Sequence, residues 1–166
     1  MNKYYIGFDA GTQSVKVAIY SLNMETIAET SYPTIIYYPH SGWVEMDVNE
    51  YLEGVKKGIR DCVIQMKEKG LNPSEIRGIF GDGIICGIVG INEEGKPITP
   101  YINYLDSRCQ ADVEYISKMN LDIWAKETGN PLPNCMFPAM IARWMLKNTD
   151  FSISGSKFVH NAPYIL

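Results

Sequence analysis

The first 34 residues constrain the fold most, because apolar β-forming runs alternate there with short turns. Residues 4–9 form a mostly apolar and aromatic run. A Gly-Thr-Gln-Ser turn then leads to residues 15–20, in which apolar residues recur at every second position. This alternation has the period of a β-strand. With a third run rich in β-forming residues at 26–34, the pattern predicts an antiparallel meander joined by short turns.

A long amphipathic helix is predicted after the meander. Asp47 can cap its first free amides, and Glu50 three residues later completes a capping-box pattern. Apolar side chains within residues 51–66 fall on one helical face. Gly70 and Pro73 mark the end of this helix.

The remainder of the chain predicts further strands and helices. Strands are expected at residues 76–80, 84–91, 98–105 and 157–166. Helices are expected at residues 110–119, 121–127 and 138–148. A sharp break is expected at the Gly-Asp-Gly of residues 81–83, and a hairpin turn at residues 92–95. This order of elements predicts a mixed α/β layer architecture.

Composition narrows the classes of function. The 166 residues carry a net charge of −4, unlike the basic footprint of a nucleic-acid binder. The N-terminus does not have the pattern of a signal peptide, and no stretch approaches the ~18 consecutive apolar residues of a membrane span. The four cysteines are widely spaced, without a Cys-x-x-Cys pair, and fit buried thiols in a reducing compartment. We therefore expect a soluble cytoplasmic protein with no nucleic-acid or membrane partner.

The segment that best carries chemistry is Asp9-Ala10-Gly11-Thr12-Gln13-Ser14-Val15-Lys16, named here the phosphate hairpin. Gly11 allows a ligand to approach the backbone closely, and successive amides in such a turn form a nest for phosphate oxygens. Asp9 is placed to hold Mg²⁺ through water, because Mg²⁺ keeps several waters and binds few carboxylates. An ordinary β-hairpin is the alternative interpretation. The predicted phosphate-binding residues are Asp9, Gly11, Thr12, Gln13, Ser14 and Lys16.

Further motifs follow in order along nearly the whole chain. They are Asp9-x-Gly11-Thr12-x-Ser14-x-Lys16, Gly42-Trp43-Val44-Glu45-Met46-Asp47, and Tyr104-Leu105-Asp106-Ser107-Arg108 after Ile98-Thr99-Pro100. Together they resemble the N-terminal part of the FGGY carbohydrate kinases, in the actin/hexokinase/heat-shock ATPase superfamily. The resemblance implies a ribonuclease H-like, actin-like ATPase N-terminal lobe, of which residues 1–166 are an incomplete part.

The resemblance also implies an activity and its ligands. The whole protein would transfer the γ-phosphate of ATP, with Mg²⁺, to a hydroxyl of a sugar or polyol of the pentulose, hexonate or glycerol class. The phosphate hairpin would face the phosphates and the metal ion. The residues expected to line the sugar pocket are Trp43, Asp82, Gly83, Asp106 and Arg108.

Two departures from the family pattern limit this expectation. Many xylulose kinases have Gln-Met-His where this chain has Ile84-Ile85-Cys86, which disfavours xylulose as the substrate. The family's general base and its adenosine-binding lobe are expected beyond Leu166. We therefore expect no catalytic residue within this chain and no turnover by the chain alone. Apolar surface left without the second lobe would favour a homodimer.

Two other functions stay open from the sequence. An ATP-binding activator of the same superfamily uses a similar hairpin, but its iron–sulfur centre would need clustered cysteines. A non-catalytic sugar-binding module is the other alternative, since a fold alone does not imply a reaction.

Overall fold

The computed structural model describes residues 3–119, 122–130, 132–151 and 155–166. The chain forms two compact units, each built from separated segments. The first unit contains Met1–Ile35, Asp47–Ile84 and Asn161–Leu166, and the second contains Ile36–Met46 and Ile85–His160.

The first unit is a four-stranded sheet with helices, in the strand order β3-β2-β1-β5. Its strands are β1 (Tyr4–Ala10), β2 (Ser14–Ser21), β3 (Thr26–Pro33) and β5 (Ile76–Gly83). Its helices are α1 (Val48–Glu68), the short 3₁₀-helix η1 (Pro73–Glu75) and α5 (Asn161–Ile165). β1, β2 and β3 pair antiparallel, which confirms the predicted meander, and β5 pairs parallel to β1.

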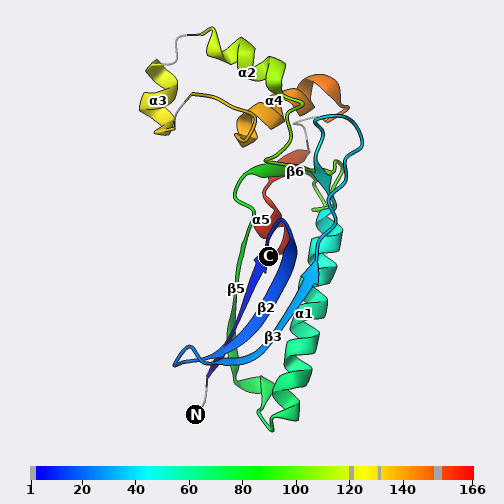
Figure 1. Ribbon diagram of the computed structural model, residues 1–166, viewed down its shortest axis with the longest axis vertical. Helices are drawn as coiled ribbons and strands as arrows, with labels where there is room; N and C mark the ends of the chain where they lie inside the picture. The colour runs from blue at the N-terminus through cyan, green and yellow to red at the C-terminus, as the bar shows by residue number, and fades with distance from the viewer. Residues whose placement is uncertain (1–2, 120–121, 131, 152–154) are drawn as a thin grey trace. The chain divides into compact units, whose positions relative to one another are not determined.

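The helix α1 runs along one face of this sheet (Figure 1). It begins where the sequence predicts, because the Asp47 carboxylate accepts a hydrogen bond from the Asn49 amide at 2.8 Å. Gly58 lets the helix approach β2 closely. A Cβ atom at this glycine would lie 2.4 Å from Cγ2 of Val17.

The break predicted at residues 81–83 is wrong. These residues belong to β5, which stays paired with β1 as far as Gly83. Gly81 is required by packing, because a Cβ atom there would lie 2.1 Å from the ring of Phe8. The chain leaves the strand only after this point, and β6 begins at Gly87.

The strand predicted at residues 157–166 is also wrong in its second half. A strand ends at Val159, and the helix α5 follows from Asn161. The Asn161 side chain accepts a hydrogen bond from the Ala162 amide at 2.7 Å, which satisfies a free donor at the start of this helix.

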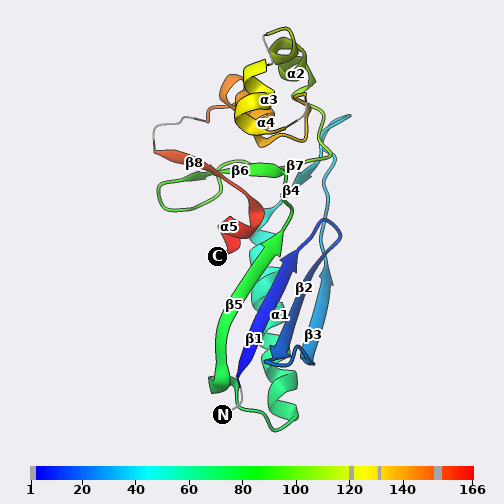
Figure 2. The same ribbon diagram turned by 90° about the vertical axis from the view of Figure 1, so that its left-hand side faces the viewer.

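The second unit contains short antiparallel strands in the order β4-β7-β6-β8, with helices gathered on one side of them (Figure 2). Its strands are β4 (Glu45–Met46), β6 (Gly87–Asn92), β7 (Tyr101–Asn103) and β8 (Ser156–Val159). Its helices are α2 (Gln110–Ser117), α3 (Asp122–Thr128) and α4 (Pro138–Asn148). β7 is shorter than the strand predicted at residues 98–105, whereas α4 has the predicted bounds.

Apolar packing and ion pairs to one buried carboxylate hold α2 against α4 in the second unit. Met140, Ile141 and Met145 of α4 are buried together with Val113 of α2. Asp112, which is 1% exposed, pairs with Arg143 and Lys147 of α4 at 2.9 Å each. Among all the residues described, no helix is long and apolar enough to cross a membrane.

Candidate functional site

The turn of the phosphate hairpin is closed by a backbone hydrogen bond from the Gly11 amide to the Ser14 oxygen, at 3.1 Å. Gly11 does not have a positive φ, so glycine is favoured here because there is little room for a side chain. A Cβ atom there would lie 3.3 Å from both Oδ2 of Asp9 and the Ser14 oxygen, which is a tight contact. The turn therefore folds closely over the Asp9 carboxylate.

Two amides of this turn are available to a ligand. Within the described part of the chain, neither the Thr12 amide nor the Gln13 amide has a hydrogen-bond acceptor. Both residues are accessible to solvent, since Thr12 is half-buried and Gln13 is exposed. Adjacent free amides in a tight turn form a concave donor site for an anion.

Three charged side chains gather beside the turn. Asp9 and Asp82 are direct neighbours across the parallel pair β1 and β5, near the carboxyl ends of both strands. Lys16 lies opposite Asp9 on β2, with its Nζ 3.6 Å from Oδ2 of Asp9. The Asp9 and Lys16 side chains are 48% and 64% exposed, so both remain accessible to a ligand or ion. Asp9 and Lys16 line a hollow of about 690 Å³ in the surface of this unit.

The structure brings Asp82 next to Asp9 rather than leaving it in a separate turn, as the predicted break implied. Oδ1 of Asp82 accepts a hydrogen bond from the Gly83 amide at 2.7 Å. Among the described residues, the other carboxylate oxygen of Asp82 has no hydrogen-bond partner. Two neighbouring, accessible carboxylates suit Mg²⁺, which binds few carboxylates and keeps several waters.

Gly83 makes room for a buried side chain. A Cβ atom at this glycine would lie 2.7 Å from Oδ1 of Asn161 and 3.0 Å from the Ala10 oxygen. The absence of a side chain at Gly83 thus allows Asn161 to contact Ala10 of β1. The sugar contact expected for Gly83 stays a prediction.

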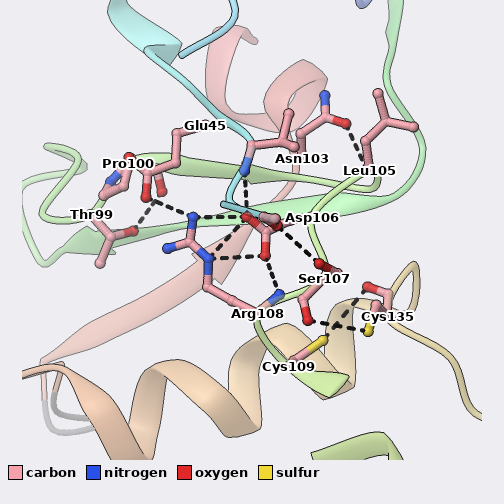
Figure 3. Close-up of polar contacts among 12 residues, drawn as sticks. Glu45, Thr99, Pro100, Asn103, Leu105, Asp106, Ser107, Arg108, Cys109 and Cys135 are labelled. Atoms are coloured by element: carbon pink, nitrogen blue, oxygen red, sulfur yellow. Dashed lines mark hydrogen bonds and ion pairs between the residues drawn. The ribbon is translucent and has the colours of Figure 1, made fainter. Parts of the chain in front are cut away.

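In the second unit, Asp106 and Arg108 form a buried ion-pair cluster (Figure 3). Nη2 of Arg108 lies 2.8 Å from Oδ2 of Asp106 and 2.7 Å from Oε1 of Glu45. Asp106 also accepts a hydrogen bond from the Val44 amide at 2.6 Å. The exposed fractions of the Arg108 and Asp106 side chains are only 3% and 1%.

Aromatic rings complete the environment of this arginine. The Arg108 Cζ atom lies 3.8 Å from the ring centre of Trp43 and 5.1 Å from that of Trp144. The two indoles meet edge to face, with ring centres 5.3 Å apart. The cluster therefore joins the Trp43 segment to the Asp106–Arg108 segment and to α4.

Burial limits what this cluster can contact. Asp106 has almost no exposed surface, and both of its carboxylate oxygens are engaged by Arg108 and by backbone amides. Direct contact with a sugar hydroxyl stays a prediction for this pair. Trp43 and Arg108 both line a pocket of about 260 Å³ within the same unit.

Sequence reasoning missed three residues whose side chains form hydrogen bonds to the backbone of the phosphate hairpin. Tyr51, Thr34 and Asn161 each donate a hydrogen bond to one of its carbonyl oxygens. The only available signal was Tyr51, which the sequence places on the buried face of α1. Nothing in the sequence connects Asn161 with a turn 151 positions earlier.

The cysteines are all free thiols, and Cys62 and Cys109 are buried as predicted. Cys86 and Cys135 are only partly buried. Cys109 and Cys135 lie close together, with the Cys109 sulfur 3.8 Å from the Cys135 oxygen (Figure 3). Burial raises the pKa of the Cys109 thiol, and contact with the Cys135 thiol raises it further.

The match to a family model and the matches to individual proteins both point to carbohydrate kinases. The N-terminal domain of the FGGY family of carbohydrate kinases matches residues 4–158. A glycerol kinase of Citrifermentans bemidjiense is 30% identical over 152 residues, which cover 89% of this chain and 30% of the kinase. A xylulose kinase of Staphylococcus epidermidis is 31% identical over 103 residues, covering 62% of this chain and 20% of the kinase.

A solved structure agrees with the fold. The crystal structure of Plasmodium falciparum glycerol kinase with ADP superposes with a TM-score of 0.86, at 18% sequence identity. The match covers 99% of this chain and 33% of that structure. The chain thus spans about a third or less of the length of the relatives it matches.

Proposed function

The chain belongs to the FGGY family of carbohydrate kinases, and from this premise we propose that it forms the phosphate-binding part of an ATP-dependent sugar or polyol kinase. The observation that carries this proposal is the pair of free amides at Thr12 and Gln13, beside the accessible Asp9 and Lys16. A nest of amides with a cation nearby binds the oxygens of a phosphate, and an adjacent carboxylate binds the metal ion that accompanies it.

The residues in and beside the phosphate hairpin then each have a role. The amides of Thr12 and Gln13 bind phosphate oxygens, with the hydroxyls of Thr12 and Ser14 as further donors. Lys16 balances charge at the same place. Asp9, with Asp82 beside it, would hold Mg²⁺ through water, and the ion would supply neutralisation of phosphate charge.

The substrate proposal comes from the relatives and from the residues of the second unit. Relatives of this chain phosphorylate different compounds, as the names glycerol kinase, xylulose kinase and gluconokinase state. We infer a sugar or polyol of the pentulose, hexonate or glycerol class, with Trp43 as an apolar wall against its carbon face. Asp106 and Arg108 support this wall from within the buried cluster.

Catalysis needs more than this chain supplies. In-line transfer requires the acceptor hydroxyl, the γ-phosphate and the metal ion to be held together, commonly by lobes that close on the substrates. The chain covers about 30% of its glycerol kinase relative. Residues 1–166 are thus proposed as part of the N-terminal domain, and the chain alone is expected to bind phosphate without turnover.

Titration of the ¹⁵N-labelled chain with Mg²⁺ and ADP tests the phosphate site. The Thr12 and Gln13 amide signals should shift, and the Asp9→Asn variant should weaken the response by about tenfold, the loss expected for one charged contact. The matched control is Asp61→Asn, which removes a carboxylate of α1 in the same unit that does not touch the phosphate hairpin. Shifts confined to other regions of the chain would contradict the proposed site.

A further inference from the structure

We propose that Tyr51 and Thr34 are positioning residues of the phosphate hairpin, which turn its carbonyl oxygens inward so that the Thr12 and Gln13 amides face the phosphate, while Asn161 fixes the strand end that precedes the turn. This inference rests on the proposed phosphate-binding function of the turn. It assigns a role to three side chains that lie outside the motif itself. All three belong to the same compact unit as the turn.

The first two carbonyl oxygens of the turn accept hydrogen bonds from distant parts of the chain. The Ala10 oxygen accepts from Nδ2 of Asn161 at 2.8 Å and from the Ile84 amide at 3.3 Å. The Gly11 oxygen accepts from the Tyr51 hydroxyl at 3.0 Å. These donors come from α5, from the residue that follows β5, and from α1.

The next two carbonyl oxygens are held by one residue. Oγ1 of Thr34 donates to the Thr12 oxygen at 2.6 Å, and the Thr34 amide donates to the Gln13 oxygen at 3.1 Å. Four consecutive carbonyls, from Ala10 to Gln13, therefore have donors within the protein.

The orientation of the amides follows from the geometry of the peptide bond. In a planar trans peptide, the C=O of one residue and the N–H of the next point in opposite directions. Holding the Gly11 carbonyl against Tyr51 directs the Thr12 N–H away from α1. Holding the Thr12 carbonyl against Thr34 directs the Gln13 N–H away from Thr34. These are the two amides without an acceptor among the described residues.

The donors are themselves well fixed. Tyr51 is 2% exposed and Asn161 is 0% exposed. Burial raises the pKa of the Tyr51 hydroxyl, a hydrogen bond with Thr34 lowers it, and the nearby Asp9 carboxylate raises it. The net shift of this pKa is upward, so this hydroxyl keeps its proton and remains a donor at neutral pH. A phosphate site with its amides already oriented loses less free energy on binding than one that must reorganise.

The test compares two variants that remove one hydroxyl each, Tyr51→Phe and Thr34→Val, with the wild-type chain. In the ligand-free chain, the ¹³C′ signals of Gly11 and Thr12 should move in the respective variant. Inorganic pyrophosphate with Mg²⁺ should then bind about threefold to tenfold more weakly to each variant, as expected for one hydrogen bond. Thr34→Ser should restore wild-type binding, because it keeps the hydroxyl.

Matched controls separate positioning from general stability. Tyr164→Phe removes a hydroxyl that bonds Oδ1 of Asn49, and Thr30→Val removes one that lies 3.5 Å from the Gly58 oxygen. Both lie in the same unit and leave the turn untouched, so both should bind pyrophosphate as the wild type does. The unfolding midpoint of every variant is measured alongside, to show that binding is compared between folded chains.

The outcomes distinguish this inference from the function on which it rests. If the wild-type amides respond to pyrophosphate and Tyr51→Phe and Thr34→Val bind it equally well, the positioning role is overturned and the phosphate site stands. Binding losses equal to those of the two controls overturn it as well. If the wild-type Thr12 and Gln13 amides do not respond, the proposed function fails, and the positioning role fails with it.

Discussion

Arg108 carries a full charge, yet its side chain is only 3% exposed because carboxylates and aromatic rings surround it. Two carboxylates, Asp106 and Glu45, pair with its guanidinium, and Trp43 lies against its flat face. A planar guanidinium can satisfy all of these contacts at once, whereas a lysine ammonium cannot. The residue type is therefore explained by a structural role, independent of any sugar contact.

Replacing Arg108 with alanine should destabilise the chain by about 3–5 kcal/mol, since Asp106 would remain buried without its partner. Urea unfolding monitored by tryptophan fluorescence measures this, because Trp43 and Trp144 lie in the same cluster. Arg60→Ala is the control, since Arg60 is exposed on α1, and it should stay within about 0.5 kcal/mol of the wild type. Equal effects of the two substitutions would contradict the structural role of Arg108.

The buried thiols should resist alkylation in the folded chain. Burial raises the pKa values of Cys62 and Cys109, so at pH 8 each has a smaller thiolate fraction when folded than when unfolded. Since the thiolate is the nucleophile, iodoacetamide should modify both cysteines far more slowly in the native chain than in urea. Peptide mass spectrometry gives the two rates, and equal rates in native and unfolded chains would contradict the burial of these thiols.

At the scale of elements, the contact between α1 and the sheet depends on glycines inside the helix. Glycine costs about 1 kcal/mol relative to alanine in a helix interior, so propensity alone would favour alanine at Gly54 and Gly58. Packing opposes this at Gly58, where a Cβ atom would lie 2.4 Å from Val17. At Gly54 the nearest atom, in Val15, would be 3.2 Å away.

Gly58→Ala is therefore expected to destabilise the chain by about 1–3 kcal/mol, the usual range for an overpacked core, despite the gain in helix propensity. Gly54→Ala should be markedly milder, because a small shift relieves its contact. Urea unfolding of both variants compares them directly. A Gly58→Ala chain as stable as the wild type would show that α1 does not approach β2 as closely as described.

The sequence predicted correctly those elements whose formation depends on residues close together in the chain. Alternating apolar residues gave the β1–β2–β3 meander, and the Asp47 cap gave the start of α1. The glycines at 81 and 83 were misleading, because a sequence cannot distinguish glycine required by a turn from glycine required by a neighbouring ring or side chain. Here Phe8 and Asn161 impose the requirement.

The candidate site was predicted only in part, for the same reason. The residues of the phosphate hairpin are contiguous, so one motif contains them. Tyr51, Thr34 and Asn161 reach the turn only through the tertiary fold. Asp82 became a neighbour of Asp9 because β5 pairs parallel to β1, a register that the sequence pattern does not specify.

At the scale of the whole molecule, the chain crosses between its two units several times. It leaves the first unit after Ile35, returns at Asp47, leaves again after Ile84 and returns at Asn161. The last return places α5 against the phosphate hairpin through Asn161. A truncation before Asn161 would remove this contact, and with it the only side chain that bonds the Ala10 oxygen among the described residues.

Truncation after residue 160 should therefore disturb the phosphate hairpin even though it removes only residues 161–166. The Ala10 oxygen keeps the Ile84 amide but loses its Asn161 partner, and the expected loss of stability is at least about 1 kcal/mol, the usual net contribution of one hydrogen bond. Urea unfolding and the Gly11–Ser14 amide signals measure the effect. Removing Leu166 alone is the control and should leave both unchanged, because its side chain is exposed.

Phosphate transfer by the full-length protein that carries this chain tests the central claim most directly. Release of ADP from Mg²⁺ and ATP is measured with glycerol, xylulose and gluconate in turn, beside the 166-residue chain alone. We predict that one such compound stimulates release by the full-length protein, that Asp9→Asn lowers this rate at least ~100-fold, and that the chain alone is inactive. Sugar-dependent ADP release by the chain alone, or a full rate in Asp9→Asn, would contradict the account.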